Sequence, residues 1–393
     1  MSALHLCSDH VRDPSASSGH LDAKVVPCID LVDEYEWDAL VSDNDFFNSY
    51  RWLSSLDVAL GTAEILTVRG CTGLVAGCGL WNGELIPGMF YLPDLFAGLS
   101  GPWHREFVWI GGRRSTHNEI PCVVGKRRTD TLRCLARAAL DAAIVRGSIG
   151  FVSPYMPVRA AKEFAKASGG VFLLHSAEAA SRVPAGGLSE AMSSWKAHDR
   201  IQGKAEIAAF KRNGNRIEWT AIDEGIEALA ARLIAQNRAR YGSTQGDEWM
   251  KRMFSAQRKA GVLQAATAAV ARRGDAIVAL TVFYRFGQVL HARYFGSDYA
   301  VGGNDFRYFM LCYYEPLNYA ASRGLTQLRL STSALAAKVR RGALIEPLAA
   351  VVVMADQEQL DLSAVEHHNR NFLENFQRKY AGHLSLEWSL VTS

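Results

Sequence analysis

Short runs of consecutive apolar residues alternate along the chain with longer stretches in which apolar residues recur every three or four positions. The runs predict strands and the longer stretches predict amphipathic helices. In the first half we expect two strands joined by a turn, at 63–68 and 73–80, and later a helix at 129–146 followed by a strand at 149–152. Such alternation is typical of α/β or α+β folds.

The second half shows a similar order of elements. Two helices are expected at 225–241 and 247–260, then three strands, then a helix at 306–323 and further strands. The halves share no detectable residue pattern, so the repeat is one of architecture. Because 393 residues exceed one ordinary core, we expect two domains. The predicted boundaries are a mobile N-terminal tail at 1–23, a first domain at 24–186, a linker at 187–217 and a second domain at 218–393.

The composition excludes several classes of protein. A chain that is 49% hydrophobic is not disordered, and a net charge of +3 is low for a dedicated nucleic-acid binder. The seven cysteines include no C-x-x-C pair, which favours a reducing cytoplasm and no metal site. No apolar stretch of membrane-spanning length and no signal sequence is visible, so we expect a cytoplasmic protein without membrane association.

The predicted linker has a distinctive composition. Within it, a polar helical run begins at Ser193-Ser194-Trp195-Lys196 and ends at Asn213-Gly214-Asn215. Taken alone, mixed charge of this kind is typical of a solvated surface helix.

With that linker between two α/β halves, the chain resembles the tandem-GNAT proteins related to the Fem-type aminoacyl transferases and the CelD-like acetyltransferases. The resemblance covers roughly residues 25–390, and the order of its motifs carries more weight than any single motif. Besides the linker, the segments that carry it are Phe46–Leu53, His291–Tyr299, Cys312–Ala320 and Ala336–Gly342.

The resemblance implies two GNAT-like domains, the second of them catalytic. In this fold an amine attacks an activated acyl group held in the gap between two splayed parallel strands. The protein must then position the reactants, accept a proton and stabilise the oxyanion. It implies an N-acyltransferase with no tightly bound cofactor, acting on a small-molecule amine in specialised-metabolite or cell-wall precursor biosynthesis.

Four residues are candidates for the chemistry. Lys338 falls in a stretch rich in basic residues, where relatives that use aminoacyl-tRNA carry a lysine, and it could stabilise an oxyanion or grip a donor phosphate. Tyr294 and Tyr313 could protonate a leaving group, and His291 could act as a base. The competing interpretations are a solvated loop for Lys338 and core packing for the other three.

Basic residues are candidates for holding the donor. Those assigned to donor binding are Arg293, Lys338, Arg340, Arg341, Lys196 and Arg200. A second basic patch before the long helix of the first half consists of Lys126, Arg127 and Arg128.

The donor stays open between two classes. Aminoacyl-tRNA suits the basic patches and the Fem-type relatives. A phosphopantetheine thioester, on coenzyme A or an acidic carrier protein, would fill the same gap. The glycine-rich turn that binds coenzyme A in this fold is absent from both halves, and the Glu and His of a Gly-Glu-His-Lys run found in some relatives are missing before Lys338. A third possibility is therefore a non-catalytic binding module.

Overall fold

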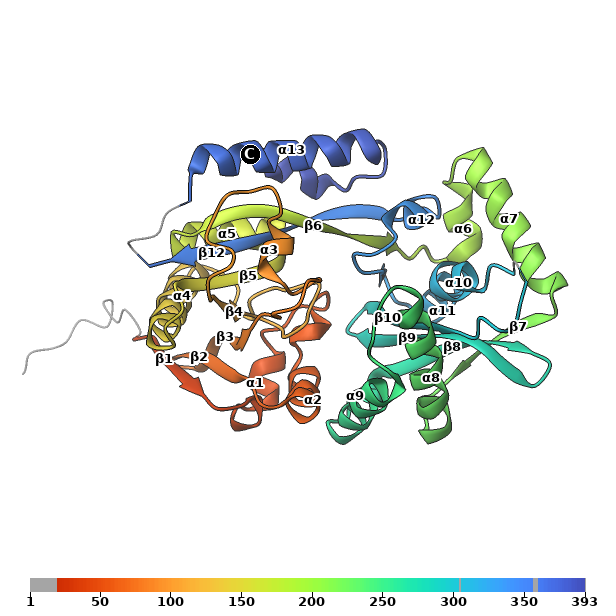
Figure 1. The fold of residues 1–393 in the computed structure, drawn as a ribbon, viewed down its shortest axis with the longest axis horizontal. Coiled ribbons are helices and arrows are strands. Elements are labelled where there is room, and N and C mark those ends of the chain that lie inside the picture. The colour runs from red at the N-terminus through yellow and green to blue at the C-terminus, as the bar shows by residue number, and fades with distance from the viewer. Residues whose placement is uncertain (1–19, 304, 356–359, 393) are drawn as a thin grey trace, which may run out of the picture.

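The computed structural model describes residues 20–303, 305–355 and 360–392. Across these residues a single mixed sheet contains 12 strands in the order β1-β2-β3-β4-β5-β12-β6-β11-β10-β9-β8-β7 (Figure 1). The strands of the first half are β1 (Asp22–Val26), β2 (Glu64–Gly70), β3 (Gly73–Asn82), β4 (Val108–Ile110), β5 (Gly150–Pro157) and β6 (Val171–Arg182). Those of the second half are β7 (Asn215–Thr220), β8 (Ala266–Arg273), β9 (Ala276–Phe286), β10 (Val289–Ser297), β11 (Gln327–Arg329) and β12 (Leu344–Met354).

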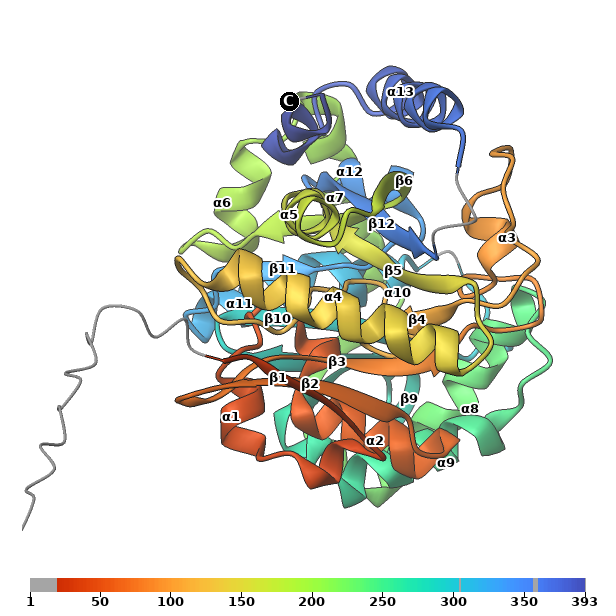
Figure 2. The same ribbon diagram turned by 90° about the vertical axis from the view of Figure 1, so that its left-hand side faces the viewer.

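The helices pack on both faces of this sheet. The α-helices of the first half are α1 (Glu34–Asp38), α2 (Tyr50–Leu60), α3 (Leu92–Leu95), α4 (Arg128–Val145) and α5 (Val158–Ser168). Those that follow are α6 (Gly187–Ser193), α7 (Ala197–Arg212), α8 (Glu224–Arg240), α9 (Asp247–Lys259), α10 (Arg307–Phe309), α11 (Glu315–Ser322), α12 (Leu335–Val339) and α13 (Leu362–Lys379). Figure 2 shows α4 and α5 in front of the first half's strands, and α4 buries there the apolar stripe that the pattern at 129–146 predicts.

The two halves exchange strands. β12 comes from the end of the chain, yet it lies between β5 and β6 and pairs antiparallel with both. β6 in turn pairs with β11 of the second half. Figure 1 shows β6 and β12 running side by side from one half into the other. Each half therefore lacks a complete sheet of its own, and their backbone hydrogen bonds join the halves into one unit. The division of the chain into two domains near residues 186 and 218 therefore remains a prediction.

Each half contains one adjacent pair of parallel strands that separates after a short ladder. β4 pairs with β5 only from Val108 to Trp109, and β10 pairs with β11 only from Val289 to His291. Beyond these residues the strands diverge. Because this is the splayed geometry expected of two GNAT-like domains, the structure confirms the predicted fold class.

Most predicted elements are present, with three differences. The helix expected at 306–323 is interrupted by a π-helical turn at Met310–Tyr314. The linker expected as one helical run is two helices, α6 and α7, separated at Trp195. Helix α13 was not predicted. It begins at a cap in which Asp361 accepts from the Ser363 amide at 2.9 Å.

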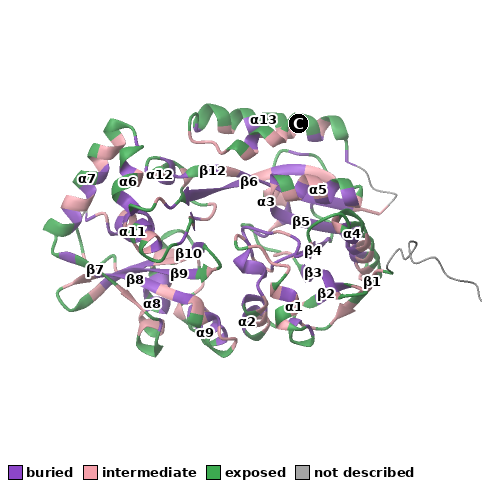
Figure 3. Cartoon of the chain, turned by 180° about the vertical axis from the view of Figure 1, so that it is seen from behind, coloured by how far each residue is buried: buried purple, intermediate pink, exposed green. Residues whose placement is uncertain are grey.

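Many of the buried residues lie on the central strands of the sheet. Figure 3 shows the central strands largely buried and the outer faces of α7 and α13 exposed. In the described part of the chain, no helix is long and apolar enough to cross a membrane. The predicted mobile tail at 1–23 lies outside the described residues up to position 19, and β1 begins at Asp22.

Candidate functional site

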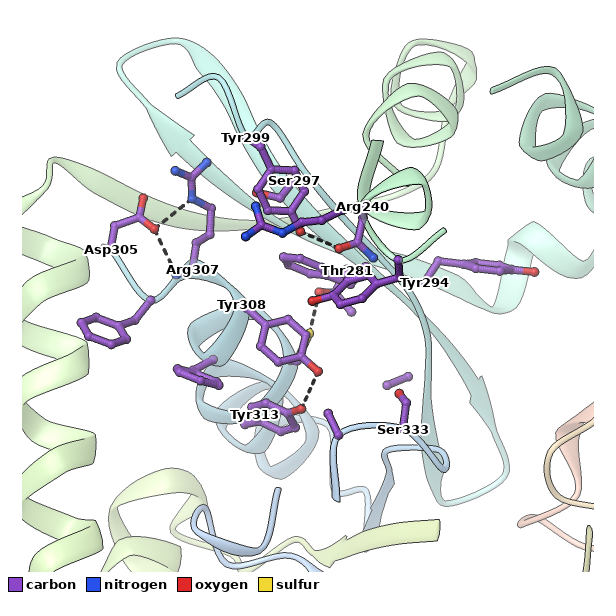
Figure 4. Close-up of a pocket in the computed structure, with 18 of the residues that line it drawn as sticks. Arg240, Thr281, Tyr294, Ser297, Tyr299, Asp305, Arg307, Tyr308, Tyr313 and Ser333 are labelled. Carbon is purple, nitrogen blue, oxygen red and sulfur yellow. Dashed lines mark hydrogen bonds and ion pairs between the residues drawn. The ribbon is translucent and has the colours of Figure 1, made fainter. Parts of the chain in front are cut away.

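A cavity of about 820 Å³ opens where β10 and β11 separate in the second half. One wall is the free part of β10, and another is the turn and π-helix that follow it (Figure 4). The loop from Leu330 to Ala334 and the start of α12 form a third wall. The cavity thus lies in the gap in which the predicted chemistry requires an activated acyl group.

Aromatic rings and hydroxyls dominate the lining, together with a few cations. The lining includes Arg240, Arg293, Tyr294, Tyr308, Tyr313 and Lys338. Both aspartates of the lining are engaged. Asp305 pairs with Arg273 and Arg307, and Asp298 accepts from the Ala300 amide at 2.9 Å. The charges left facing a ligand are therefore mainly positive.

Lys338 is buried and lines this cavity. Its Nζ donates to the carbonyl oxygens of Leu330 and Ser331, the latter at 2.9 Å. Ser331 and Ala334 have φ of 65° and 52°, values that non-glycine residues rarely adopt. Burial lowers the pKa of Lys338 to about 8. The lysine thus holds a strained loop in place and brings a poorly solvated ammonium to the donor gap.

Arg293 occupies a bulge in β10, where the pairing with β9 shifts between Ala292 and Tyr294. Its Nη2 donates to the carbonyl oxygen of Arg114 at 3.2 Å, and its guanidinium lies 4.7 Å from the Phe47 ring centroid. Arg293 therefore sits where the two halves meet and also lines the cavity. This is consistent with the predicted donor role and does not test it.

A second guanidinium approaches the same place from the first half. Burial lowers the pKa of Arg114, its ion-pair partner Glu84 opposes that shift, and Arg293 adds to it. The guanidiniums of Arg238 and Arg114 lie 4.4 and 5.7 Å from the ring centroid of Trp249. The three arginines place more positive than negative charge beside the mouth of the cavity.

The two tyrosines predicted for catalysis both line the cavity. Tyr294 packs edge-on against Phe254, with centroids 6.0 Å apart. Tyr313 is buried, and its hydroxyl donates to the Tyr308 hydroxyl at 2.8 Å. Figure 4 shows Tyr308 and Tyr313 together on the helical wall, facing the hollow. The structure brings Lys338, Tyr294, Tyr313 and Arg293 to one site.

Two other predicted residues have different surroundings. His291 is buried among Phe46 and Phe47 and bonds through Nε2 to the Asp43 carbonyl at 3.0 Å. Burial lowers its pKa to about 3, and it does not line the cavity. Arg341 pairs with both oxygens of buried Glu206 at 2.7 and 2.8 Å. These contacts favour packing roles for both, because both side chains are buried and neither lines the cavity.

The remaining predicted basic residues lie outside the cavity. Arg340 and Lys196 are exposed, and Arg200 donates to the Trp195 carbonyl at 3.1 Å. Lys126 and Arg127 are exposed before α4. Arg128 forms an ion pair with Glu163 at 2.9 Å. The second basic patch therefore belongs to the first half, and it contributes no residue to the cavity.

The equivalent gap in the first half is filled by a side chain. A loop, residues 111–119, leaves β4 where the strand separates from β5 and turns Asn118 back into the gap. Asn118 Nδ2 donates to the Ile110 carbonyl on β4 at 3.2 Å and to the Pro154 carbonyl on β5 at 3.1 Å. Its backbone amide donates to the Tyr155 carbonyl at 2.9 Å. In the described residues, only the second half keeps its splayed strands open.

The same loop carries a buried histidine to the junction of the halves. His117 Nδ1 contacts the Glu178 carboxylate on β6, and its Nε2 lies 3.2 Å from Glu119. Arg329 on β11 bonds Glu178 as well as Glu346 on β12, the latter at 2.9 Å. Burial and Arg329 oppose the charge on His117, but the two glutamates outweigh them and raise its pKa to about 9. This network ties together the exchanged strands.

Sequence reasoning assigned no role to three of these residues. Tyr308 could have been found only by expecting a π-helical turn, which no residue pattern announces. Asn118 lies in a loop without regular structure. Glu178 stands among Ala177, Ala179 and Ala180, and an acid in that run was a visible signal for a buried partner.

Comparison with known proteins places these features in context. Residues 188–382 match a FemAB-like family described as acting in peptidoglycan biosynthesis or recognition. The fold is similar to that of FemX, at 12% identity and a TM-score of 0.57, over 83% of this chain and 97% of that one. A conserved protein of unknown function from Bacteroides thetaiotaomicron is 13% identical with a TM-score of 0.55, covering 82% of this chain and 98% of that one.

A third similar structure is the C-terminal domain of a protein named as a lysylphosphatidylglycerol synthetase from Agrobacterium fabrum. It is 9% identical with a TM-score of 0.52, over 84% of this chain and 93% of that one. No curated protein matches the chain in sequence. At these identities the structural likeness establishes the fold.

Proposed function

We propose that the chain, which matches a FemAB-like family over residues 188–382 and shares the fold of FemX, transfers an acyl group to a small-molecule amine in the second half's cavity. The observation that carries the proposal is the contrast between the two halves. One pair of splayed strands opens onto a cavity of about 820 Å³, while the other is closed by Asn118. A direct attack needs one such gap to hold the acyl carbonyl beside unpaired backbone amides.

The amine attacks the carbonyl carbon, a C–N bond forms, and the bond to the donor's leaving atom breaks. Lys338 supports this step because its ammonium is poorly solvated and lies against the cavity, so it attracts the oxyanion or a donor phosphate strongly. Arg293 and Arg240 suit the negative charges of a large donor at the mouth of the cavity.

For the donor we propose aminoacyl-tRNA. Its acceptor end is single-stranded and polyanionic, and it matches a mouth lined by arginines and by rings such as Tyr299 and Tyr241. The acceptor would be a peptidoglycan-type precursor, a lipid headgroup or a specialised metabolite. The second candidate donor is a phosphopantetheine thioester on an acidic carrier protein, which the same cations would favour.

Binding across a salt series tests the donor. Purified protein is titrated with total aminoacyl-tRNA, and separately with an acyl-loaded acidic carrier protein. Tight tRNA binding that weakens steeply with salt, and that weakens further in Arg240→Ala, supports the first donor. Binding of the carrier alone moves the donor to the thioester. Binding of neither contradicts both assignments and favours a non-catalytic module.

A further inference from the structure

The two tyrosines on the helical wall form a pair whose geometry comes from the π-helical turn. Tyr308 and Tyr313 are five positions apart, and in an α-helix five residues rotate about 140° beyond a full turn. The turn at Met310–Tyr314 has wider hydrogen bonding, from residue i to i+5, which returns position 313 beneath position 308. The rings meet edge to face with centroids 5.5 Å apart.

Strong local contacts hold this arrangement. Arg307, next to Tyr308, is buried and donates to three backbone carbonyls, of Val278, Asp298 and Val301, at 2.6 to 3.1 Å. Phe306 begins the helix with a φ of 56°, a strained value for an aromatic residue. A π-turn and a strained residue both cost free energy, and such features gather where function requires them.

One of the two hydroxyl protons in this pair makes no hydrogen bond within the described part of the chain. The Tyr313 hydroxyl donates to the Tyr308 oxygen at 2.8 Å, so the Tyr308 O–H proton has no acceptor in the described residues. Both tyrosines line the cavity, but Tyr308 is half-buried and Tyr313 is buried. Burial raises the pKa of both phenols, so each remains a donor at neutral pH. The free O–H therefore belongs to the residue that a ligand can reach.

We propose that Tyr308 is the general acid of the acyl transfer and that Tyr313 is the positioning residue that orients its hydroxyl. This inference rests on the proposed function. As the C–N bond forms and the carbonyl carbon separates from the leaving atom, Tyr308 gives its proton to that atom. It regains a proton from the nitrogen of the new amide. The net change is one amine proton moved to the leaving group, and the tyrosine ends unchanged.

A series of donors that differ only in the leaving group tests the role. The donors are an aminoacyl-tRNA ester, the aminoacyl-pantetheine thioester and the aminoacyl thiophenyl ester, each with the same mixture of radiolabelled amino acids and a pool of primary amines. Wild type is compared with Tyr308→Phe, Tyr313→Phe and the control Tyr319→Phe. Tyr319 stacks on Trp219 at 3.8 Å outside the cavity.

Removing a general acid lowers the rate most for the donor with the poorest leaving group. We expect Tyr308→Phe to lower kcat about 100-fold for the ester and only a few-fold for the thiophenyl ester. Tyr313→Phe should show the same trend with smaller losses, and Tyr319→Phe should match wild type. Equal losses on all donors, or no loss, overturn the role of Tyr308. If wild type transfers from no donor, the proposed function fails and this inference fails with it. Melting temperatures close to that of wild type exclude misfolding as the cause.

Discussion

Asn118 Nδ2 lies 3.2 Å from Ser153 Oγ on β5 and also donates to the Ile110 carbonyl on β4, so this side chain bridges the gap between the two strands in the first half. The equivalent gap in the second half stays open and holds the cavity. The two halves share one architecture, so the difference arises from the loop that carries Asn118. Its side chain satisfies the backbone groups that separation of the strands leaves unpaired.

Replacing Asn118 by Ala should destabilise the protein and leave catalysis by the folded fraction unchanged. The change leaves the buried Pro154 carbonyl and the buried Gly112 amide without the side chain that they bond, at a cost of about 3 kcal/mol in the free energy of unfolding. Denaturant unfolding measures the loss. Asn213→Ala is the matched control because Asn213 makes a single half-buried contact, to the Ala209 carbonyl at 2.8 Å. A kcat that falls with N118A in the folded enzyme would mean that the first half takes part in the chemistry.

Sequence patterns predicted the elements well where their signal is local. The strands at 64–70 and 73–82 and the helix at 128–145 follow from periodicity alone. The exchange of β12 could not be predicted from periodicity, because an apolar run such as Leu348–Met354 fits any buried position in a sheet equally well. The placement depends on which neighbours complete the backbone ladder.

In the candidate site, too, some residues could be predicted from the sequence, and others depend on neighbours that are distant in the sequence. The order of motifs indicated the region of Lys338, Tyr294 and Arg293, and the structure brings those residues together. His291 follows the same strand, but the neighbouring Phe46 and Phe47 come from far away in the sequence and bury it. Arg341 was assigned from its charge, and only the fold reveals its partner, Glu206.

Glu206 and Arg341 should prove to be structural. Glu206→Ala leaves a buried guanidinium unpaired and should lower the free energy of unfolding by about 4 kcal/mol. The double variant Glu206→Leu/Arg341→Met removes both charges and should recover most of that loss. Chemical denaturation of the single and double variants measures the coupling. If the double variant is stable but no longer binds aminoacyl-tRNA, Arg341 has the donor role after all.

His117 should make stability depend on pH. Its pKa is raised to about 9 in the folded state from 6.5, so the folded protein binds more protons than the unfolded chain between these values. The stabilisation is complete below about pH 6.5 and is lost as pH rises through 9, on the order of 3 kcal/mol. We expect wild type to lose stability over this range relative to His117→Asn. If the free energy of unfolding depends on pH in the same way in the two proteins, His117 is not protonated in the folded state.

As pH rises above 8, Lys338 should increase the free energy of unfolding and decrease kcat. Its pKa is about 8 in the folded state and 10.5 ordinarily, so the unfolded chain binds more protons between these values. The free energy of unfolding should rise by on the order of 3 kcal/mol across that range, relative to Lys338→Met, which carries no charge. Acyl transfer needs the ammonium, so kcat should fall as pH passes 8. Lys338→Met should be slower at every pH and lack this alkaline limb. If wild type and variant share one pH profile for kcat, then Lys338 supports only the loop that it holds through Ser331.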